Sequence, residues 1–372
     1  MVAEALIHQY GPEVPQRIAA MLRQVYPAFD GAAFLADVAQ GYDALGLMAR
    51  GTHMAHALRR HLPVDFDTAV GLLVASTRAD VDLGDGSLAP FTFLPHTCFV
   101  AEYGLPHFTA AMRAQHALTQ VFTAEFSIRP FLIHHTQATL RQLAQWANDP
   151  SERVRRLVSE GTRPRLPWGQ RLRAFQQDPA PVLALLELLK DDPALYVRRS
   201  VANNLNDIGK DHPDALLAVA EHWWRQPTAH RRWVVTHALR SLIKAGDPRA
   251  LALLGYGGQT RVVVADVCID PPAPRMGESV RWTFGLHNAS AQPQALLVDC
   301  GVHFVKASGQ TRLKVFKLKT VVLAPGDTEA FGKKLSLAPM TTRRLHPGTH
   351  RVDVHINGVT QPLGMFDLRA AD

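Results

Sequence analysis

The chain has 372 residues, of which 47% are hydrophobic and 20% charged, and its formal net charge is +7. This composition is typical of a folded protein and excludes a disordered one, while the length allows two domains or a repeat array with an appended module. The start of the chain lacks a secretory signal, and no stretch reaches the roughly 18 uninterrupted apolar residues of a membrane span. We therefore expect a soluble cytoplasmic protein.

The first 254 residues repeat one theme, in which apolar residues recur at helical spacing in short segments closed by Pro, Gly or Asp. Three segments, NDPSERVRRLVSEG, DDPALYVRRSVANNL and RQPTAHRRWVVTHAL, share a turn with proline, an arginine pair and an apolar run. Their arginines are 43 residues apart from Arg155 to Arg198 and 34 apart from Arg198 to Arg232. This spacing predicts an all-α, HEAT-like repeat solenoid over residues 1–254.

The periodicity changes after the Gly-rich break GYGGQT. Short alternating segments follow, among them SVRWTFGLHN and ALLVDCGVHFV, and turn formers such as DPPAPRMGES separate them. About seven such strands predict a small all-β, immunoglobulin-like sandwich over residues 259–372. The three cysteines (Cys98, Cys268 and Cys300) have no metal-ligand spacing and imply no disulfide framework.

The stretch YVRRSVANNLNDIGKDHP is the most polar of the predicted helices. On a helical wheel its apolar residues form one face. The opposite face is expected to carry Arg199, Asn203 and Asn206, with Asp207 on its flank. In the preceding repeat, the residues expected to point outward are Arg155, Arg156, Ser159 and Glu160.

Basic residues concentrate in the same region. Residues 151–250 hold 17 Lys and Arg against 11 Asp and Glu. Such an excess suits an anionic partner, nucleic acid first and an acidic membrane second, although a solvated basic surface gives the same balance. Because the arginine pair recurs in three repeats, we interpret it as a stripe able to follow a phosphate backbone, which places Arg199, Arg231 and Arg232 on DNA.

Two further stretches carry candidate chemistry. TAEFSIRPFLIHH contains Glu125, either a reactive carboxylate or a carboxylate favoured by a helix N-terminus. SEGTRPRLPWG places Trp168 in a Pro-rich linker, where the indole either packs on a neighbouring helix or is offered to a cation or a sugar. No HExxH, GxGxxG, GxxxxGK[ST] or GxSxG motif occurs, so neither a metal nor another cofactor is predicted.

The segments YVRRSVANNLNDIGKDHPDALL, AEFSIRPFL and SEGTRPRLPWG, in chain order, resemble the HEAT-repeat DNA alkylation-repair glycosylases, specifically the AlkC branch. A C-terminal immunoglobulin-like domain, known in one subgroup of that branch, is similar to the β-rich tail here. The resemblance implies hydrolysis of the N-glycosidic bond of cationic bases such as 3-methyladenine, 3-methylcytosine and 1-methyladenine, without base flipping, in base excision repair.

The resemblance also implies roles for individual residues. Glu125 and Asp207 would be catalytic carboxylates beside the oxocarbenium-like sugar, and Trp168 would stack on the deoxyribose or the cationic nucleotide. The residues implied to position the lesion strand are Arg156, Glu160 and Arg163.

In the sandwich, basic loops and strands add Lys314 and Lys317 as DNA-contact candidates, although lysines that protect an edge strand give the same pattern. The expected partner is double-stranded DNA with alkylated bases, bound by a monomer in the bacterial cytosol or nucleoid. Two alternatives stay open, namely a non-catalytic binder of damaged or branched DNA and a HEAT-repeat protein scaffold.

Overall fold

The structure is a computed structural model that describes residue 7 and residues 10–83, 89–257, 260–340 and 344–370. The chain divides into two compact units. The first comprises residues 1–216 and 225–238, and the second comprises residues 217–224 and 239–372. Within the described ranges, no helix combines the length and apolarity required to traverse a lipid bilayer.

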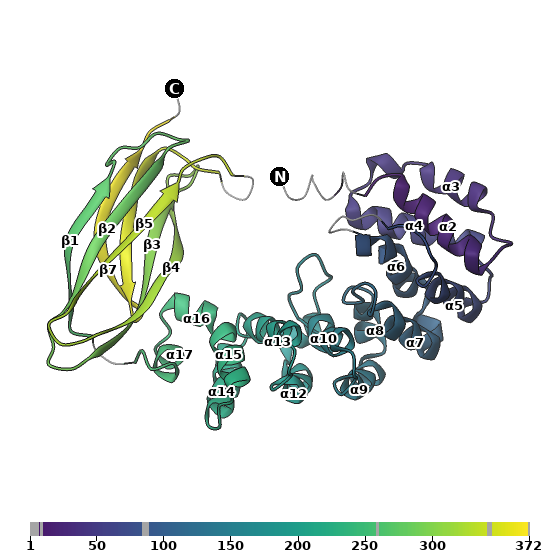
Figure 1. Cartoon of the computed structure of the whole chain (residues 1–372), viewed down its shortest axis with the longest axis horizontal. Coiled ribbons are helices and arrows are strands. Elements are labelled where there is room, and N and C mark those ends of the chain that lie inside the picture. Colours follow the sequence, from purple (N-terminus) through teal and green to yellow (C-terminus); the bar gives the residue numbers. More distant parts are fainter. Residues whose placement is uncertain (1–6, 8–9, 84–88, 258–259, 341–343, 371–372) are drawn as a thin grey trace. The chain divides into compact units, whose positions relative to one another are not determined.

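The first unit is built from helices that follow one another along the chain (Figure 1). Its first half contains α2 (Glu13–Val25), α3 (Gly31–Ala39), α4 (Leu47–His61), α5 (Phe66–Ser76), α6 (Leu94–Tyr103), α7 (Phe108–Leu118), α8 (Ile128–His134) and α9 (Thr136–Trp146). Its second half contains α10 (Glu152–Gly161), α11 (Arg173–Gln177), α12 (Ala180–Leu189), α13 (Leu195–Ile208) and α15 (Ala229–Ala238), and α14 (Pro213–Trp224) leads into the second unit.

Several helices begin where the sequence provides a cap. Asp30, Asp65 and Asp247 each accept a hydrogen bond from the backbone N–H three residues later, which satisfies a donor that the first helical turn leaves free. Apolar residues recur at helical spacing throughout WVVTHALRSLIKAGDP, residues 233–248, which predicts one helix, but the structure divides this segment at Leu239. α15 packs against α13 in the first unit, whereas α16 (Arg240–Ala245) and α17 (Pro248–Leu253) belong to the second.

The second unit contains the predicted sandwich, with seven strands in two antiparallel sheets (Figure 1). One sheet has the order β1-β2-β5, from β1 (Val262–Asp270), β2 (Ser279–Asn288) and β5 (Thr328–Ser336). The other has the order β4-β3-β6-β7, from β4 (Thr311–Leu323), β3 (Gln294–Val305), β6 (Gly348–Ile356) and β7 (Val359–Leu368). This is the strand arrangement of an immunoglobulin-like domain.

Alternation along the strands builds the sandwich core. Trp282 and Phe284 of β2 and Cys300 and Val302 of β3 all point into it. All three cysteines of the chain are free thiols, so side-chain packing replaces a disulfide between the sheets. Residue 259, at the predicted start of this domain, lies outside the described residues.

The predicted outward faces of α10 and α13 were wrong for two residues on each helix. Ser159 and Glu160 of α10 are buried, and so are Asn206 and Asp207 of α13. The reason is that α13 packs against α10 on one side and α15 on the other, so its polar flanks lie at interfaces between repeats. Asn206, for example, donates from Nδ2 to the carbonyl oxygen of Ala238 at 2.8 Å.

Candidate active site

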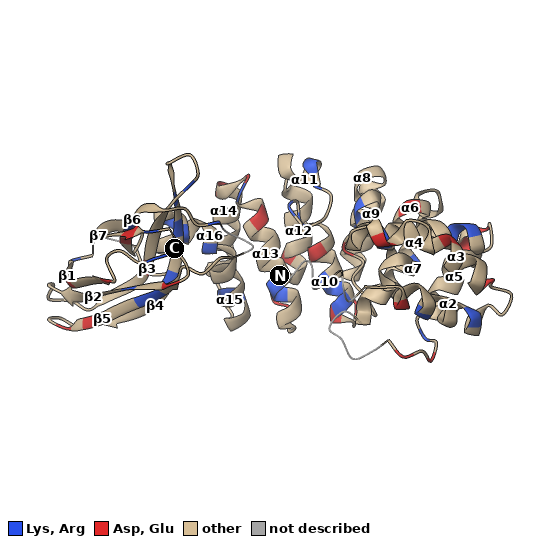
Figure 2. Ribbon diagram, turned by 90° about the horizontal axis from the view of Figure 1, so that it is seen from above, with Lys and Arg blue, Asp and Glu red and all other residues tan. Residues whose placement is uncertain are grey.

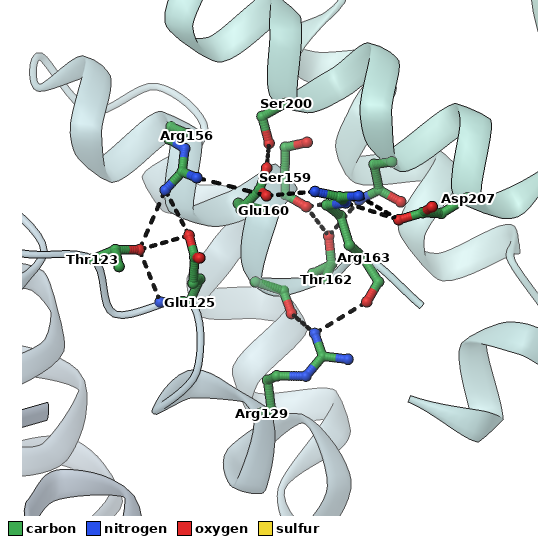
Figure 3. Close-up of polar contacts among 12 residues, drawn as sticks. Thr123, Glu125, Arg129, Arg156, Ser159, Glu160, Thr162, Arg163, Ser200 and Asp207 are labelled. Atoms are coloured by element: carbon green, nitrogen blue, oxygen red, sulfur yellow. Dashed lines mark hydrogen bonds and ion pairs between the residues drawn. The ribbon is translucent and has the colours of Figure 1, made fainter. Parts of the chain in front are cut away.

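The polar residues between α10 and α13 form one charged network (Figure 3). Its centre is Glu160, whose Oε1 accepts from Arg163 Nη1 at 2.6 Å and whose Oε2 accepts from the Ser200 hydroxyl at 2.6 Å. Arg156 lies one helical turn before Glu160, with Nη2 3.6 Å from Oε1. Glu160 is therefore held between two arginines from its own repeat and a hydroxyl from the next.

One end of the network is Glu125, just before α8. Its Oε2 accepts from Arg156 Nη1 at 2.7 Å and from the Thr123 hydroxyl at 2.7 Å. The guanidinium of Arg156 also lies over the ring of Tyr196, 4.8 Å from its centroid. Glu125 therefore has one oxygen engaged by a fixed cation at the boundary with solvent, where its side chain is 12% exposed.

The other end is Asp207, which is only 1% exposed. Its Oδ2 accepts from Arg163 Nε at 2.8 Å, and Oδ1 accepts from Lys210 Nζ at 2.7 Å. A carboxylate buried this deeply stays charged only where cations and hydrogen bonds replace its water, as Arg163 and Lys210 do here. Asp207 is thus a fixed negative charge.

Electrostatics hold the two arginines in their charged form. Burial alone would lower the pKa of Arg156, but the carboxylates of Glu125 and Glu160 outweigh it and raise the pKa above its ordinary value. Burial also works against charge on Arg163, and there Glu160 and Asp207 produce the same net rise in pKa. Three carboxylates and three cations thus alternate along the network.

Trp168 lies in the loop that follows α10, and it is not packed. The side chain is 68% exposed and the backbone has φ 61°, a left-handed conformation that is strained for a bulky residue. The loop around it is anchored, because Leu166 is buried and Arg165 makes a two-pronged ion pair with Asp211. Of the two fates predicted for this indole, the structure favours an exposed face over core packing.

The first arginine of each recurring pair has a structural role. Arg155 Nη1 donates to the carbonyl oxygens of Asp149 and Pro150, and Arg198 Nη1 donates to those of Asp192 and Pro193. Arg231 does the same with Gln226 in the third repeat. Each arginine closes the turn before its helix, so the recurrence has a cause other than phosphate binding and does not by itself indicate a stripe.

The remaining predicted contacts lie outside the network. Arg199 and Arg232 are exposed on α13 and α15, and Arg231 also pairs with Asp191, with Nη2 2.5 Å from the carboxylate. Figure 2 shows basic residues on both helices; α13 also contains Asp207, whereas the sequence of α15 contains no acidic residue. Lys314 and Lys317 are exposed on β4 of the second unit.

Sequence reasoning missed several partners of the network, namely Thr123, Tyr196, Ser200, Lys210 and the buried Arg129 of α8. Lys210 could have been found, since it lies three residues after Asp207, in the turn that follows α13. Ser200 reaches Glu160 across 40 residues of sequence, which only the packing of α13 on α10 reveals.

Two known proteins are similar to this chain over nearly its whole length. The "Uncharacterized protein YhaZ" of Bacillus subtilis (strain 168) is 37% identical over 350 residues, which are 94% of this chain and 95% of that protein. The structure titled "Pseudomonas fluorescens alkylpurine DNA glycosylase AlkC bound to DNA containing an abasic site analog" superposes with a TM-score of 0.90 at 39% identity, covering 97% of this chain and 98% of that one. The chain belongs to the AlkC branch of the HEAT-repeat DNA alkylation-repair glycosylase family.

The C-terminal part of this AlkC-branch chain matches separately. Residues 263–370 match the family described as "Uncharacterised protein YhaZ, C-terminal Ig-like domain". This range spans all seven strands except the first residue of β1. The predicted combination of a helical repeat region with an immunoglobulin-like domain is therefore confirmed.

Proposed function

We propose that this chain is a monofunctional DNA glycosylase, which hydrolyses the N-glycosidic bond of cationic N-alkylated bases in DNA. The proposed substrates are 3-methyladenine, 3-methylcytosine and 1-methyladenine, removed without base flipping in base excision repair. The observation that carries the proposal is the buried, charge-balanced network ending in Glu125 and Asp207, with the exposed Trp168 on a loop of the same repeat.

The proposed chemistry follows from the charge of the substrate. A cationic base leaves as a neutral molecule when the bond from C1′ to nitrogen breaks, so no strong general acid is required. Positive charge then develops on the sugar, and fixed carboxylates stabilise it. A water molecule adds its oxygen to C1′ and loses a proton, which leaves an abasic site.

The contacts suggest a division of roles between the carboxylates. Both oxygens of Asp207 are occupied by cations, so we assign it a fixed electrostatic role. In Glu125, Oε2 accepts both hydrogen bonds that the carboxylate makes with described residues, which leaves Oε1 able to orient the attacking water. Trp168 would stack on the deoxyribose or the cationic nucleotide.

We further propose that Arg156, Glu160 and Arg163 position the lesion strand, the two arginines through phosphate contacts. The proposed contacts to the DNA backbone elsewhere are Arg199, Arg232, Lys314 and Lys317. Arg231 is kept in this set, with the smallest expected contribution because Asp191 already occupies its guanidinium. The proposed partner is alkylated double-stranded DNA, bound by a monomer.

The test is base release from methylated duplex DNA under single-turnover conditions. We expect the wild-type protein to release base, and Glu125→Gln to lower the rate about 100-fold while affinity for DNA is kept. The control is Glu102→Gln, since this exposed glutamate lies outside the network, 3.9 Å from His56. No release by the wild type, together with tight binding to the same DNA, would favour the non-catalytic binder.

A further inference from the structure

Arg129 is a buried arginine at the base of the loop that carries Trp168. Its side chain projects from α8 and is 1% exposed. The Nε atom donates to the carbonyl oxygen of Gln170 at 2.6 Å. The Nη1 atom donates to the carbonyl oxygens of Gly161 at 2.9 Å and Arg163 at 3.0 Å (Figure 3). One guanidinium therefore ties together both ends of the segment from residue 161 to residue 170.

The three carbonyl groups belong to functionally different parts of this segment. Gly161 is the last residue of α10. The Arg163 side chain bridges Glu160 and Asp207, and Gln170 comes two residues after Trp168. Arg129 thus connects the backbone that supports the carboxylates with the backbone that supports the exposed indole.

The loop depends on such a tie because Trp168 adopts a left-handed backbone conformation, which persists only where the surroundings impose it. Gly161 permits the close approach of α10 to α8 that brings its carbonyl group to Arg129. A Cβ atom at this position would lie 2.6 Å from Cγ2 of Ile128, the neighbour of Arg129.

Stability alone does not account for a cation at this place. The Nη2 atom is buried and has no hydrogen-bond partner in the part of the chain that the structure describes. Burial also lowers the pKa of Arg129 to about 10. The unpaired Nη2 atom and the buried charge both oppose folding. We therefore relate the presence of an arginine here to the loop conformation that its hydrogen bonds impose.

We propose that Arg129 is a positioning residue for base excision. It touches no substrate and acts through the loop, where it fixes Trp168 relative to Asp207 and Arg163. This inference rests on the proposed glycosylase function. A misplacement of about 1 Å in such an arrangement lowers a rate about 100-fold, so we expect loss of Arg129 to lower the rate of excision much more than the affinity for DNA.

Arg50 provides a matched control within the same unit. This arginine of α4 is 8% exposed and also binds three backbone carbonyl oxygens, those of Leu45 at 3.0 Å, Tyr10 at 2.6 Å and Asp43 at 3.2 Å. None of these residues belongs to the network of Glu125 and Asp207. Arg50→Met therefore removes an equivalent set of hydrogen bonds and leaves the loop of Trp168 untouched.

The experiment compares Arg129→Met, Arg129→Lys and Arg50→Met in the full chain, at a temperature where each is folded. We expect Arg129→Met to excise about 100-fold more slowly at saturating protein, with its Kd for an abasic-site duplex within about 3-fold of wild type. Arg129→Lys should recover part of the rate, because lysine keeps the charge and fewer of the hydrogen bonds. Equal rates for Arg129→Met and Arg50→Met would overturn the proposal.

Two further measurements separate positioning from other causes. In a Trp168→Ala background, Arg129→Met should cause little additional loss of rate, whereas a full additional 100-fold loss would show that Arg129 does not act through Trp168. Trypsin should cleave folded Arg129→Met faster than wild type after Arg165 and Arg171, which lie in the loop. Unchanged cleavage there would show that Arg129 does not hold the loop.

The outcome for the wild type distinguishes this proposal from the proposed function. An inactive wild type ends both the glycosylase proposal and the role of Arg129 in excision. An active wild type with a fully active Arg129→Met ends only the positioning role.

Discussion

Each of the two units contains a buried aspartate that is paired with basic side chains. In the helical unit, Asp207 is buried against Arg163 and Lys210. In the sandwich, Asp353 of β6 is equally buried, with Oδ2 2.5 Å from His303 Nε2 and Oδ1 3.2 Å from Arg351 Nε. Each aspartate therefore has two cationic or potentially cationic partners, and burial with pairing does not distinguish a functional site from a structural one.

The tryptophans differ more than the aspartates do. Trp168 is exposed on a strained loop beside the helical network, whereas Trp282 is fully buried in the core of the sandwich. Exposure of a large aromatic residue in an unfavourable backbone conformation opposes stability, while burial of one favours it. The combination of a buried carboxylate and an exposed, strained aromatic residue is what identifies the helical unit as the place of the proposed chemistry.

The largest expected effect separates the two aspartates by activity. Asp207→Asn removes the fixed negative charge beside the proposed reaction centre, so we expect single-turnover base release to fall about 1,000-fold. Asp353→Asn should leave the rate per folded molecule within about 2-fold of wild type, because Asp353 supports only the sandwich. Comparable losses in both variants would show that buried charge in either unit has the same role.

The next effect separates the two tryptophans by stability. Trp282→Ala leaves a cavity in the sandwich core, so we expect it to lower the free energy of unfolding by about 3–5 kcal/mol. Trp168→Ala should change it by less than about 0.5 kcal/mol, since the side chain is mostly exposed. Chemical denaturation followed by circular dichroism and fluorescence measures both, and a large loss for Trp168→Ala would reveal packing that the exposed side chain does not show.

The smallest effect concerns pH and two histidines, the buried His96 and the half-buried His355. Burial lowers the pKa of His96 in α6 from 6.5 to about 3, and it lowers that of His355 in β6 less, because Asp353 and Asp299 raise it in part. Below pH 6.5 the unfolded chain binds a proton that folded His96 does not, so stability is lost as pH falls. The unfolding equilibrium constant should then rise up to about tenfold per pH unit between pH 6.5 and 3.

His96→Gln tests this assignment. We expect the variant to take up about one proton fewer on unfolding between pH 4 and 5.5, measured from the slope of stability against pH. The corresponding change for His355→Gln should be smaller. Equal slopes in wild type and His96→Gln would show that His96 does not control the acid sensitivity of the helical unit.

Much of the fold could be predicted from the sequence, because it depends on local patterns. Alternation along Ser279–Asn288 marks β2 with its observed bounds, and the helical spacing in residues 66–77 marks α5 to within one residue. The exposed faces of α10 and α13 were harder to predict. Asn206 and Asp207 look like surface residues on a single wheel, and only the neighbours of α13 on both sides bury them.

The residues of the candidate site could be predicted from the sequence, but the hydrogen bonds and ion pairs that join them could not. Four of the predicted site residues, Glu125, Glu160, Arg163 and Asp207, lie in three sequence segments that resemble a known family. Arg156 lies just before one of these segments, and the structure brings all five residues together. That Arg155, Arg198 and Arg231 close turns could not be inferred from their recurrence, since a repeated turn and a repeated phosphate contact leave the same pattern in sequence. The backbone carbonyl groups that accept hydrogen bonds from Arg129 could not be predicted from the sequence either, because every residue has a carbonyl group.

The backbone of Trp168 has a consequence for anyone who engineers this protein. Glycine and asparagine adopt a positive φ more readily than tryptophan does, so a screen for thermal stability alone would favour either residue at position 168. Such variants would appear improved by melting temperature and would lack the indole. Stability and repair activity would thus be selected in opposite directions at this one position.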